Sequence, residues 1–200
     1  MRLAVEDELS EHIPRRILSE RDTRYDVTAV YRGRGFGYLR KHARAFNRSA
    51  TAAPFLLLTD LDRSDCAPTL IAEWLGRPRH PDFLLRVAVR EAEAWLLGDD
   101  SGLKAFFGAR GGGRHDRPEE LPDPKAELLR MAWSARRELQ ERLVRRDRRS
   151  GRLAQGPDYN GALGEFVARH WSVSAASSRC RSLRKLICAL DGLEARHGSR

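Results

Sequence analysis

The chain has 200 residues, 41% of them hydrophobic, which suffices for one domain with a real core or a compact domain with a helical extension. Its longest wholly apolar stretches are only four or five residues, so we expect no membrane-spanning segment. The formal net charge is +9, with 33 Arg and 4 Lys. That bias suits phosphate binding, because guanidinium grips phosphate bidentately, but a genome rich in G and C would also favour it.

The sequence also predicts a cellular compartment. No charged-then-apolar leader is present, since acidic residues begin at Glu6. Three cysteines, Cys66, Cys180 and Cys188, do not make a disulfide framework. We therefore expect a cytoplasmic protein in a reducing environment.

The first hundred residues alternate strand-like and helix-like segments. The predicted strands are 2–6, 25–31, 55–60 and 83–89. The predicted helices are 8–20, 38–50, 67–75 and 90–98. Strands and helices that alternate with connections this short predict an α/β domain over residues 1–100, with a Rossmann-like parallel sheet flanked by helices.

After Gly98 the pattern changes, and no convincing strand follows. The predicted helices are 101–107, 125–148, 159–170 and 179–191. The second half of the longest one, Arg136 to Arg149, carries seven Arg against three acidic residues. Residues 101–200 are thus expected to form a basic, all-helical extension.

Carboxylates follow two of the predicted strands. The apolar run 55–58 leads through Thr59 into Asp60 and Asp62, and the first strand leads into Glu6. Ligands of open α/β sheets bind beyond the carboxyl ends of the strands, where these side chains would gather. Such a cluster repels itself unless a divalent cation neutralises it, so Glu6, Asp60 and Asp62 predict a Mg²⁺ (or Mn²⁺) site. The alternative is a helix N-cap surrounded by solvated acids.

This arrangement suits phosphodiester cleavage. Mg²⁺ held by Asp60 and Asp62 would stabilise charge on the leaving oxygen, while Glu6 would orient or deprotonate a water. The basic helices would add affinity for the nucleic-acid backbone that does not depend on sequence. We therefore expect a metal-dependent endonuclease whose partner is nucleic acid.

A family resemblance supports the same expectation. The segments Val5-Glu6-Asp7-Glu8 and Leu58-Thr59-Asp60-Leu61-Asp62 resemble the Toprim domain, the catalytic module of topoisomerases, bacterial primases and the nucleases of the overcoming-lysogenization-defect class. The resemblance implies that Glu6 is the acid–base residue and that Asp60 and Asp62 hold Mg²⁺. Many Toprim domains have Gly directly after the Glu, where this chain has Asp7. No tyrosine fits the pattern for strand passage, so hydrolysis is preferred to topoisomerase chemistry.

The resemblance extends to a group of small bacterial Toprim-like proteins of unknown function. The matching segments are 90–97 with Asp99, 118–125, 156–159 and 182–184. Those proteins are similar to components of phage-defence or mobile-element systems. Such components are often accompanied by a separate ATPase. The resemblance therefore implies a separate ATPase subunit as a second partner and a role in antiviral defence.

Further site residues are predicted outside the carboxylate cluster. Glu93 shares a helix face with Leu96 and Leu97, which favours a metal ligand or a supporting carboxylate in the catalytic site, although an ion pair is the alternative. Lys125 and the arginines Arg181 and Arg184 are candidate nucleic-acid-binding residues, and each could instead be an ordinary solvated side chain.

Other functions stay open at this point. A phospho-receiver signalling domain would use Asp60 as phosphoacceptor, but the predicted strand 83–89 does not end in the Ser or Thr of a receiver. A haloacid-dehalogenase-like phosphatase would use Asp60 as nucleophile, and a purely structural or DNA-binding subunit would need neither. The sequence does not distinguish DNA from RNA or tRNA as substrate, nor does it give the oligomeric state.

Overall fold

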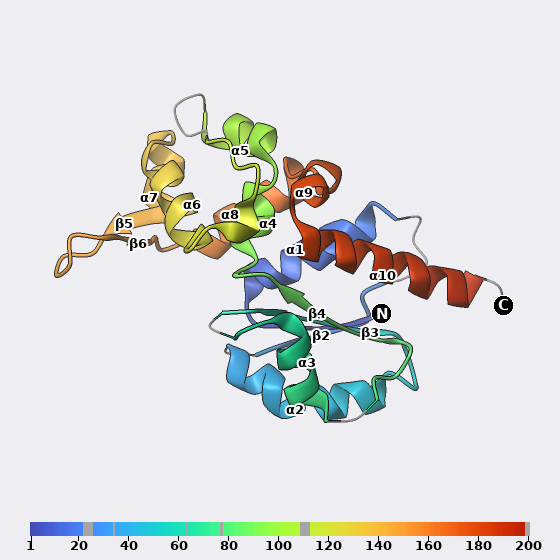
Figure 1. Ribbon diagram of the computed structural model, residues 1–200. Helices are drawn as coiled ribbons and strands as arrows, with labels where there is room; N and C mark the ends of the chain where they lie inside the picture. Colours follow the sequence, from blue (N-terminus) through green and yellow to red (C-terminus); the bar gives the residue numbers. More distant parts are fainter. Residues whose placement is uncertain (22–25, 34, 63, 77, 109–112, 199–200) are drawn as a thin grey trace. The chain divides into compact units, whose positions relative to one another are not determined.

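The computed structural model describes residues 1–198 except 22–25, 34, 63, 77 and 109–112 (Figure 1). The chain forms two compact units: residues 1–89 with 182–200, and residues 90–181. The boundary predicted at residue 100 therefore falls inside the second unit, and the C-terminal segment belongs to the first. Each unit is described separately.

The first unit is built on a parallel sheet of four strands in the order β2-β1-β3-β4. The strands are β1 (Arg2–Val5), β2 (Ala29–Arg32), β3 (Phe55–Asp60) and β4 (Phe83–Ala88). The predicted α/β fold with a parallel sheet is confirmed. The strand predicted over 25–31 begins only at Ala29, and Tyr25 lies outside the described residues.

Helices cover both faces of this sheet. They are α1 (Glu8–Ser19), α2 (Phe36–Ser49), α3 (Ala67–Leu75) and α10 (Arg181–Gly198). On one face, α2 and α3 pack against alternate residues of β3 and β4, in a buried cluster that includes Leu39, Phe46, Trp74, Phe55 and Phe83. Figure 1 shows α1 and α10 on the opposite face. Because both faces are covered, β3 can be an almost continuous apolar run.

The strand order places a topological switch point between β1 and β3. From β1 the chain passes through α1 to β2 on one side, and from β2 it crosses through α2 to β3 on the other side of β1. The connection that leaves β1 leads to one side of this strand, and the connection that leads into β3 arrives on the other side. The carboxyl ends of β1 and β3 are therefore not covered by one and the same crossover. Ligands of open α/β sheets bind at such a point.

The second unit is mostly helical, as predicted for the C-terminal part. Its helices are α4 (Glu93–Leu97), α5 (Asp100–Phe107), α6 (Pro124–Trp133), α7 (Arg137–Leu143), α8 (Tyr159–Arg169) and α9 (Val173–Arg179), with a short 3₁₀ helix, η1 (Pro118–Glu120). Two short antiparallel strands, β5 (Val144–Arg146) and β6 (Leu153–Gln155), form a hairpin.

Two predictions for this part of the chain are wrong, and a third differs in its bounds. The helix predicted over 125–148 is divided into α6 and α7 and gives way to β5, so the expectation of no strand after Gly98 also fails. The helix predicted over 179–191 is present as α10, which begins at Arg181 after a break at Cys180 and runs on to Gly198. Arg and Glu are good helix formers and neither break carries Gly or Pro, so local propensity gave no warning of the tertiary contacts that end these helices.

None of the helices in the described ranges has the length and the apolar character that crossing a membrane requires.

Candidate functional site at the carboxyl ends of β1 and β3

The carboxylate of Glu6 lies against the end of β3. Strands β1 and β3 pair with Ala4 opposite Leu57, so Glu6, two residues later, comes level with Thr59. The Thr59 hydroxyl donates to Glu6 Oε1 at 2.5 Å, and the backbone N–H of Asp60 donates to the same oxygen at 3.0 Å. The predicted proximity of Glu6 to Asp60 is therefore present, and we call Glu6, Thr59, Asp60 and Asp62 the carboxyl-edge site.

Thr59 is the member of this site that sequence reasoning missed. Its side chain is 1% exposed, one of the few buried polar side chains in the described residues. A hydroxyl in a buried strand needs a hydrogen-bond partner, and the partner is the Glu6 carboxylate. A polar residue in an otherwise apolar core strand was the available signal, but it does not tell which group the hydroxyl will meet.

Burial and charge act on Glu6 in the same direction. Burial is the largest cause that raises its pKa, the hydrogen bonds from Thr59 and Asp60 oppose this, and the negative charges of Asp62 and Asp7 raise it further. The net result is a pKa above the usual value for Glu. The influence of Asp62 shows that the second aspartate of the pair also acts on this carboxylate.

Asp60 and Asp62 differ in their environment. Asp60 is the last residue of β3 and is partly buried, whereas Asp62 is exposed in the loop that follows. Leu61 between them anchors the loop, since its N–H donates to Ala88 O at 2.9 Å. Asp62 adopts a positive φ of 48°, a left-handed conformation that Asp tolerates better than most residues. This backbone turn lets both side chains of the Asp-x-Asp pair emerge at the end of the same strand.

The side chains of this site are suited to Mg²⁺ by their chemistry. Carboxylate oxygens are the ligands that Mg²⁺ prefers, and proteins usually supply one or two of them while waters and substrate phosphates complete the shell. Within the described ranges, no three His, Cys, Asp or Glu side chains are gathered closely enough to hold a metal alone. Metal binding by Glu6, Asp60 and Asp62 therefore stays a prediction, in which waters and substrate would have to supply part of the shell.

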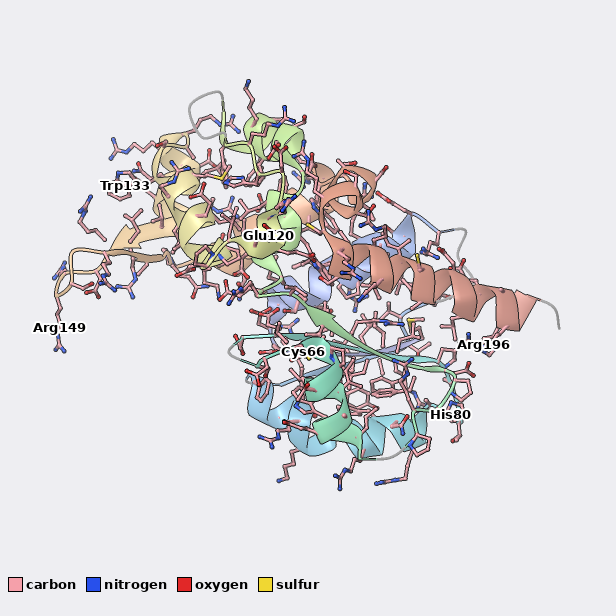
Figure 2. The ribbon with its side chains drawn as sticks, viewed as in Figure 1. Cys66, His80, Glu120, Trp133, Arg149 and Arg196 are labelled. Atoms are coloured by element: carbon pink, nitrogen blue, oxygen red, sulfur yellow. The ribbon has the colours of Figure 1, made fainter. Side chains whose placement is uncertain are left out.

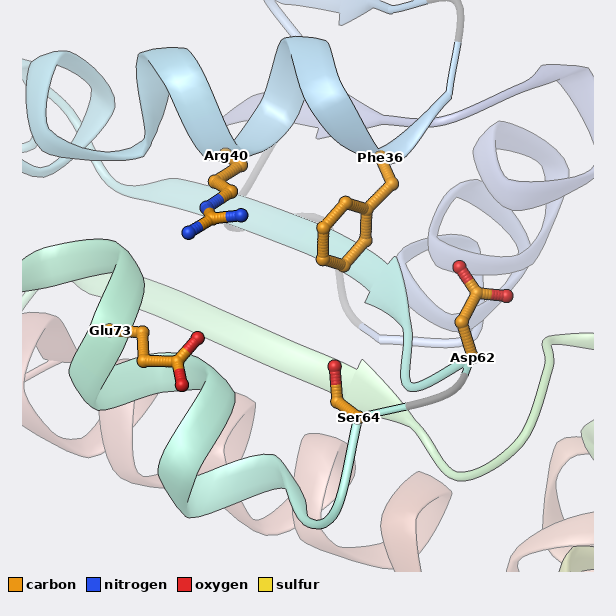
Figure 3. A pocket seen from close by; sticks show the side chains of 5 residues that line it. All are labelled: Phe36, Arg40, Asp62, Ser64 and Glu73. Carbon is orange, nitrogen blue, oxygen red and sulfur yellow. The ribbon is translucent and has the colours of Figure 1, made fainter.

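A pocket of about 600 Å³ adjoins the carboxyl-edge site (Figure 3). Its lining residues are Phe36, Arg40, Asp62, Ser64 and Glu73. Figure 3 shows Phe36 and Arg40 reaching in from α2, opposite Ser64 and Glu73 of the loop and α3. A cavity of this size can hold a small ligand or one nucleotide unit of a chain. It offers an aromatic ring, a guanidinium and a hydroxyl beside Asp62.

Glu93 and Lys125 belong to the second unit, where they form an ion pair. Glu93 is 4% exposed, its Oε1 lies 3.4 Å from Lys125 Nζ, and it accepts a hydrogen bond from the Tyr159 hydroxyl at 3.1 Å. Glu91 accepts from the backbone N–H of Lys125 at 3.2 Å, near the start of α6. These contacts explain the burial of Glu93, because a buried carboxylate needs a cation and hydrogen bonds. A catalytic role for Glu93 and a nucleic-acid contact by Lys125 stay predictions.

The two predicted arginines of the last helix lie at its start. Arg181 and Arg184 both have exposed side chains, and the backbone N–H of Arg181 donates to Glu119 Oε2 at 2.8 Å. Arg181 is the last residue of the second unit, and Arg184 belongs to the first unit. Their exposure is compatible with phosphate contacts, which stay a prediction.

Comparison with known proteins adds no relative: no family model matches the chain, and neither a curated protein nor a solved structure matches it.

Proposed function

We propose that the protein is a metal-dependent nuclease of Toprim type that hydrolyses nucleic-acid phosphodiesters at the carboxyl-edge site. One observation supports this most: the Glu6 carboxylate, with its raised pKa, lies against Thr59 and Asp60 at the topological switch point of the sheet. Acid–base chemistry needs a carboxyl whose pKa is moved toward the working pH, and burial beside other carboxylates does this.

Glu6 handles the proton in this mechanism. Both of its hydrogen bonds, from Thr59 and from Asp60, end on Oε1. The carboxylate is thereby held in one orientation, and Oε2 is the atom that takes a proton from the attacking water or returns one to the leaving oxygen. Thr59 positions Glu6 and does not touch the substrate.

Asp60 and Asp62 supply the oxygens for Mg²⁺ or Mn²⁺, which when bound would stabilise negative charge on the phosphate and on the leaving oxygen. Asp60 is fixed by its place in β3, and Asp62 by the left-handed turn after Leu61. Holding the two carboxylates on one short segment limits how far either can move, which favours a defined geometry at the phosphate.

The pocket beside Asp62 receives the nucleic-acid strand in this proposal. Arg40 makes no ion pair within the described part of the chain, so its guanidinium is available for a phosphate. The Phe36 ring offers an apolar surface for a base or sugar, and Ser64 offers a hydroxyl. The pocket thus places an aromatic ring and an arginine beside the carboxylates of Asp62 and Glu73. The ring suits a base and the arginine suits a phosphate, the two parts of a nucleotide.

The resemblance of the segments around Glu6 and Asp60 to Toprim domains agrees with these roles. By the same resemblance we propose a separate ATPase as partner and a role in antiviral defence. Copurification with an ATPase encoded beside this chain, and loss of phage protection by Asp60→Asn, would support both extensions.

The test is cleavage of labelled duplex DNA, single-stranded DNA, RNA and tRNA in Mg²⁺ and in Mn²⁺. The native chain is compared with Glu6→Gln, Asp60→Asn and Asp62→Asn, substitutions that keep the size of each side chain. We expect each variant to lose on the order of 100-fold or more in rate, the scale of a lost acid–base or metal-binding group.

Asp65→Asn is the matched control, because Asp65 is an exposed carboxylate in the same loop and lines neither the pocket nor the carboxyl-edge site. Its activity should match the native chain. Equal cleavage by the native chain and by Asp60→Asn would end the proposal.

A phospho-receiver is the second candidate, and the strand order favours it. The order 2-1-3-4 is the beginning of the order found in receivers, and Asp60 lies at the end of β3. Against it, the parallel sheet of the described residues has four strands, without the fifth that supplies a receiver's lysine. Stable labelling of Asp60 by a small phosphodonor, with no cleavage of any nucleic acid, would favour the receiver.

A further inference from the structure

The β5–β6 hairpin concentrates arginine on a projecting ribbon. Between β5 and β6 and within them lie Arg145, Arg146, Arg148, Arg149 and Arg152, all of them exposed, with Asp147 as the one carboxylate. Figure 1 shows the hairpin extending away from α6, α7 and α8 of its unit, and Figure 2 shows Arg149 at its far end. The first part of this segment was expected to be the end of a basic helix over 125–148 that adds affinity for nucleic acid, and the structure presents these charges on a two-stranded ribbon instead.

These five arginines lie close together without an ion pair in the part of the chain that the structure describes, whereas other arginines that lack one, such as Arg44 and Arg48, are not on the hairpin. None of them is in an ion pair within the described residues, whereas Arg21, Arg130 and Arg142, for example, each bind a carboxylate. Arginines that serve only as a solvated face are commonly interleaved with carboxylates. Five cations close together repel one another, so the cluster is most stable with an external polyanion.

The turn holds the ribbon in shape and occupies its only carboxylate. Asp147 Oδ1 accepts hydrogen bonds from the N–H groups of Arg149 and Ser150, at 3.1 and 2.7 Å, and from the Ser150 hydroxyl at 2.9 Å. These bonds lower the pKa of Asp147, with the bond from the Ser150 N–H as the largest cause. Gly151 follows with a φ of +69°, which only a glycine adopts without strain. The carboxylate therefore organises the tip and pairs with no arginine there.

The root of the ribbon is anchored as firmly. Arg142 binds Asp158 at 2.7 Å and Glu165 at 2.6 Å, and these carboxylates raise its pKa. Val144 is 4% exposed, and Gly156 N–H donates to Leu143 O at 2.9 Å. A ribbon fixed at both ends loses little backbone entropy when it binds a partner, which favours a binding element over a loose loop.

We infer that this hairpin binds duplex DNA, with its arginines on the phosphates that line the major groove. A two-stranded ribbon fits the B-form major groove, which is about 12 Å wide. The major groove of duplex RNA is too deep and narrow for side chains to read. Single strands are usually bound in grooves lined by several aromatic rings, whereas residues 144–155 of the hairpin contain no aromatic residue. The nearby Trp133 is 39% exposed, and the guanidinium of Arg146 lies over its ring at 5.0 Å from the centroid.

The inference deepens the proposed function, because it names the form of nucleic acid, and it rests on that function for the biological reason to bind. Binding itself needs neither the metal nor Glu6. It is therefore measured on the full chain in EDTA, where cleavage cannot occur.

The experiment is fluorescence anisotropy of a labelled DNA duplex of about two helical turns, titrated with protein at several salt concentrations. The test variant is the triple substitution Arg148→Ala, Arg149→Ala and Arg152→Ala, which leaves the Asp147 turn in place. The matched control, Arg44→Ala, Arg48→Ala and Arg169→Ala, removes the same charge from exposed positions of α2 and α8.

We expect the hairpin variant to bind duplex DNA at least about tenfold more weakly than the native chain, with the salt slope smaller by about 3, because each arginine–phosphate contact contributes roughly 0.9. The control should change both quantities much less. Equal losses in the two variants would show that only net charge matters and would overturn the inference, as would an unchanged affinity in the hairpin variant. Circular dichroism of the folded proteins guards against a loss through unfolding.

Other polyanions are run in parallel. Single-stranded DNA, duplex RNA and vesicles containing anionic lipid are titrated with the same two variants. A hairpin-dependent loss that is larger for any of these than for duplex DNA would overturn the assignment to DNA.

Failure of the inference and failure of the proposed function give different results. Hairpin-dependent duplex binding by a chain that cleaves nothing would uphold the hairpin and end the nuclease. Asp60-dependent cleavage that the hairpin variant performs as well as the native chain, with duplex binding unchanged, would do the reverse.

Discussion

The carboxyl-edge site and the β5–β6 hairpin gather charges of opposite sign by opposite means. At the carboxyl edge, Glu6 is partly buried, its Oε1 is fixed by Thr59 and Asp60, and its pKa is raised. At the hairpin, five arginines are exposed and lack ion pairs within the described residues. Burial with fixed partners tunes a group for chemistry, while exposure without a neutralising carboxylate leaves positive charge available for binding. By this comparison the carboxyl-edge site is suited to breaking a bond, and the β5–β6 hairpin is suited to holding a polyanion.

The largest expected effect tests the chemical half of this contrast. Glu6→Gln should lower cleavage by about 100-fold to 10,000-fold, because an amide cannot transfer the proton. The same substitution should raise the free energy of unfolding near neutral pH. A raised folded-state pKa means that the neutral side chain is favoured below the unfolded pKa, and that this advantage is lost as pH rises through the folded pKa.

Urea unfolding of the native chain and of Glu6→Gln, at neutral pH and near pH 4, measures the second part. The stability difference should shrink at the lower pH, where Glu6 itself takes up a proton. A variant that is less stable than the native chain at neutral pH would contradict the electrostatic description of this site.

The next effect concerns the anchor of the hairpin. A Cβ on Gly156 would lie 2.3 Å from the carbonyl oxygen of Arg142, which is backbone and cannot easily give way. Gly156→Ala should therefore cost about 2–3 kcal/mol in the free energy of unfolding, the range of an overpacked site. The midpoint of chemical denaturation measures it.

Gly151→Asn is the control in the same hairpin. Nothing lies within 4 Å of a Cβ there, and Asn tolerates the positive φ of 69° better than other residues. Its stability should fall by about 1 kcal/mol or less, the backbone strain of a left-handed Asn without any steric clash, and so by less than in Gly156→Ala. Equal losses in both variants would show that the root is no more constrained than the tip.

A smaller effect sharpens the role of Thr59. Thr59→Val removes the hydroxyl that donates to Glu6 and keeps the shape of the side chain. Because that hydrogen bond lowers the pKa of Glu6, its loss should raise that pKa further. We expect about a tenfold fall in cleavage, the scale of a lost orienting hydrogen bond, with the acid limb of the pH–rate profile moved to higher pH.

Thr59→Ser, which keeps the hydroxyl, should restore both the rate and the position of the acid limb. A Val variant with an unmoved profile and a lower rate would indicate a merely structural role for Thr59.

The smallest effect compares the exposed arginines of the hairpin with a partly buried one. Arg86 in β4 has a buried Nε with no hydrogen-bond partner, and burial, followed by the charge of Arg79, lowers its pKa to about 10. Partial burial of a guanidinium whose Nε lacks a hydrogen bond to the described residues is unfavourable, so Arg86→Met should raise the free energy of unfolding by about 1 kcal/mol. Thermal unfolding measures it. Arg148→Met at the exposed tip should leave stability unchanged.

The sequence was most informative where one local signal dominated. The strand 55–60 and the helix 67–75 were predicted with their observed bounds, because a continuous apolar run identifies a buried parallel strand and Gly76 ends the helix in a left-handed C-cap. The proximity of Glu6 and Asp60 followed from the same logic, since parallel strands end at one edge.

The rest depended on contacts that no local pattern records. The end of α6 at Trp133 and the pairing of Arg145 with Ala154 join segments whose own sequence favours a helix. The meeting of Thr59 with Glu6, and the approach of Arg40 and Glu73 to Asp62, likewise require the sheet and its helices to be in place. Local propensity depends on the residues of one segment, whereas these features depend on contacts between two segments that are distant in the sequence.

The order in which the chain is made has a consequence for the first unit. Val89, at the end of β4, donates its N–H to the Ser182 hydroxyl at 3.2 Å, so the two points where the chain leaves and re-enters this unit are neighbours. The buried residues Leu183, Leu186 and Leu190 of α10 therefore reach the sheet only after all of residues 90–181 have been synthesised. During translation one face of the four-stranded sheet therefore stays partly exposed until α10 packs on it. The whole intervening unit can fold before that happens. The residues of the carboxyl-edge site all lie in the part of this unit that is made first, so the site's hydrogen bonds can form before α10 completes the cover of the sheet.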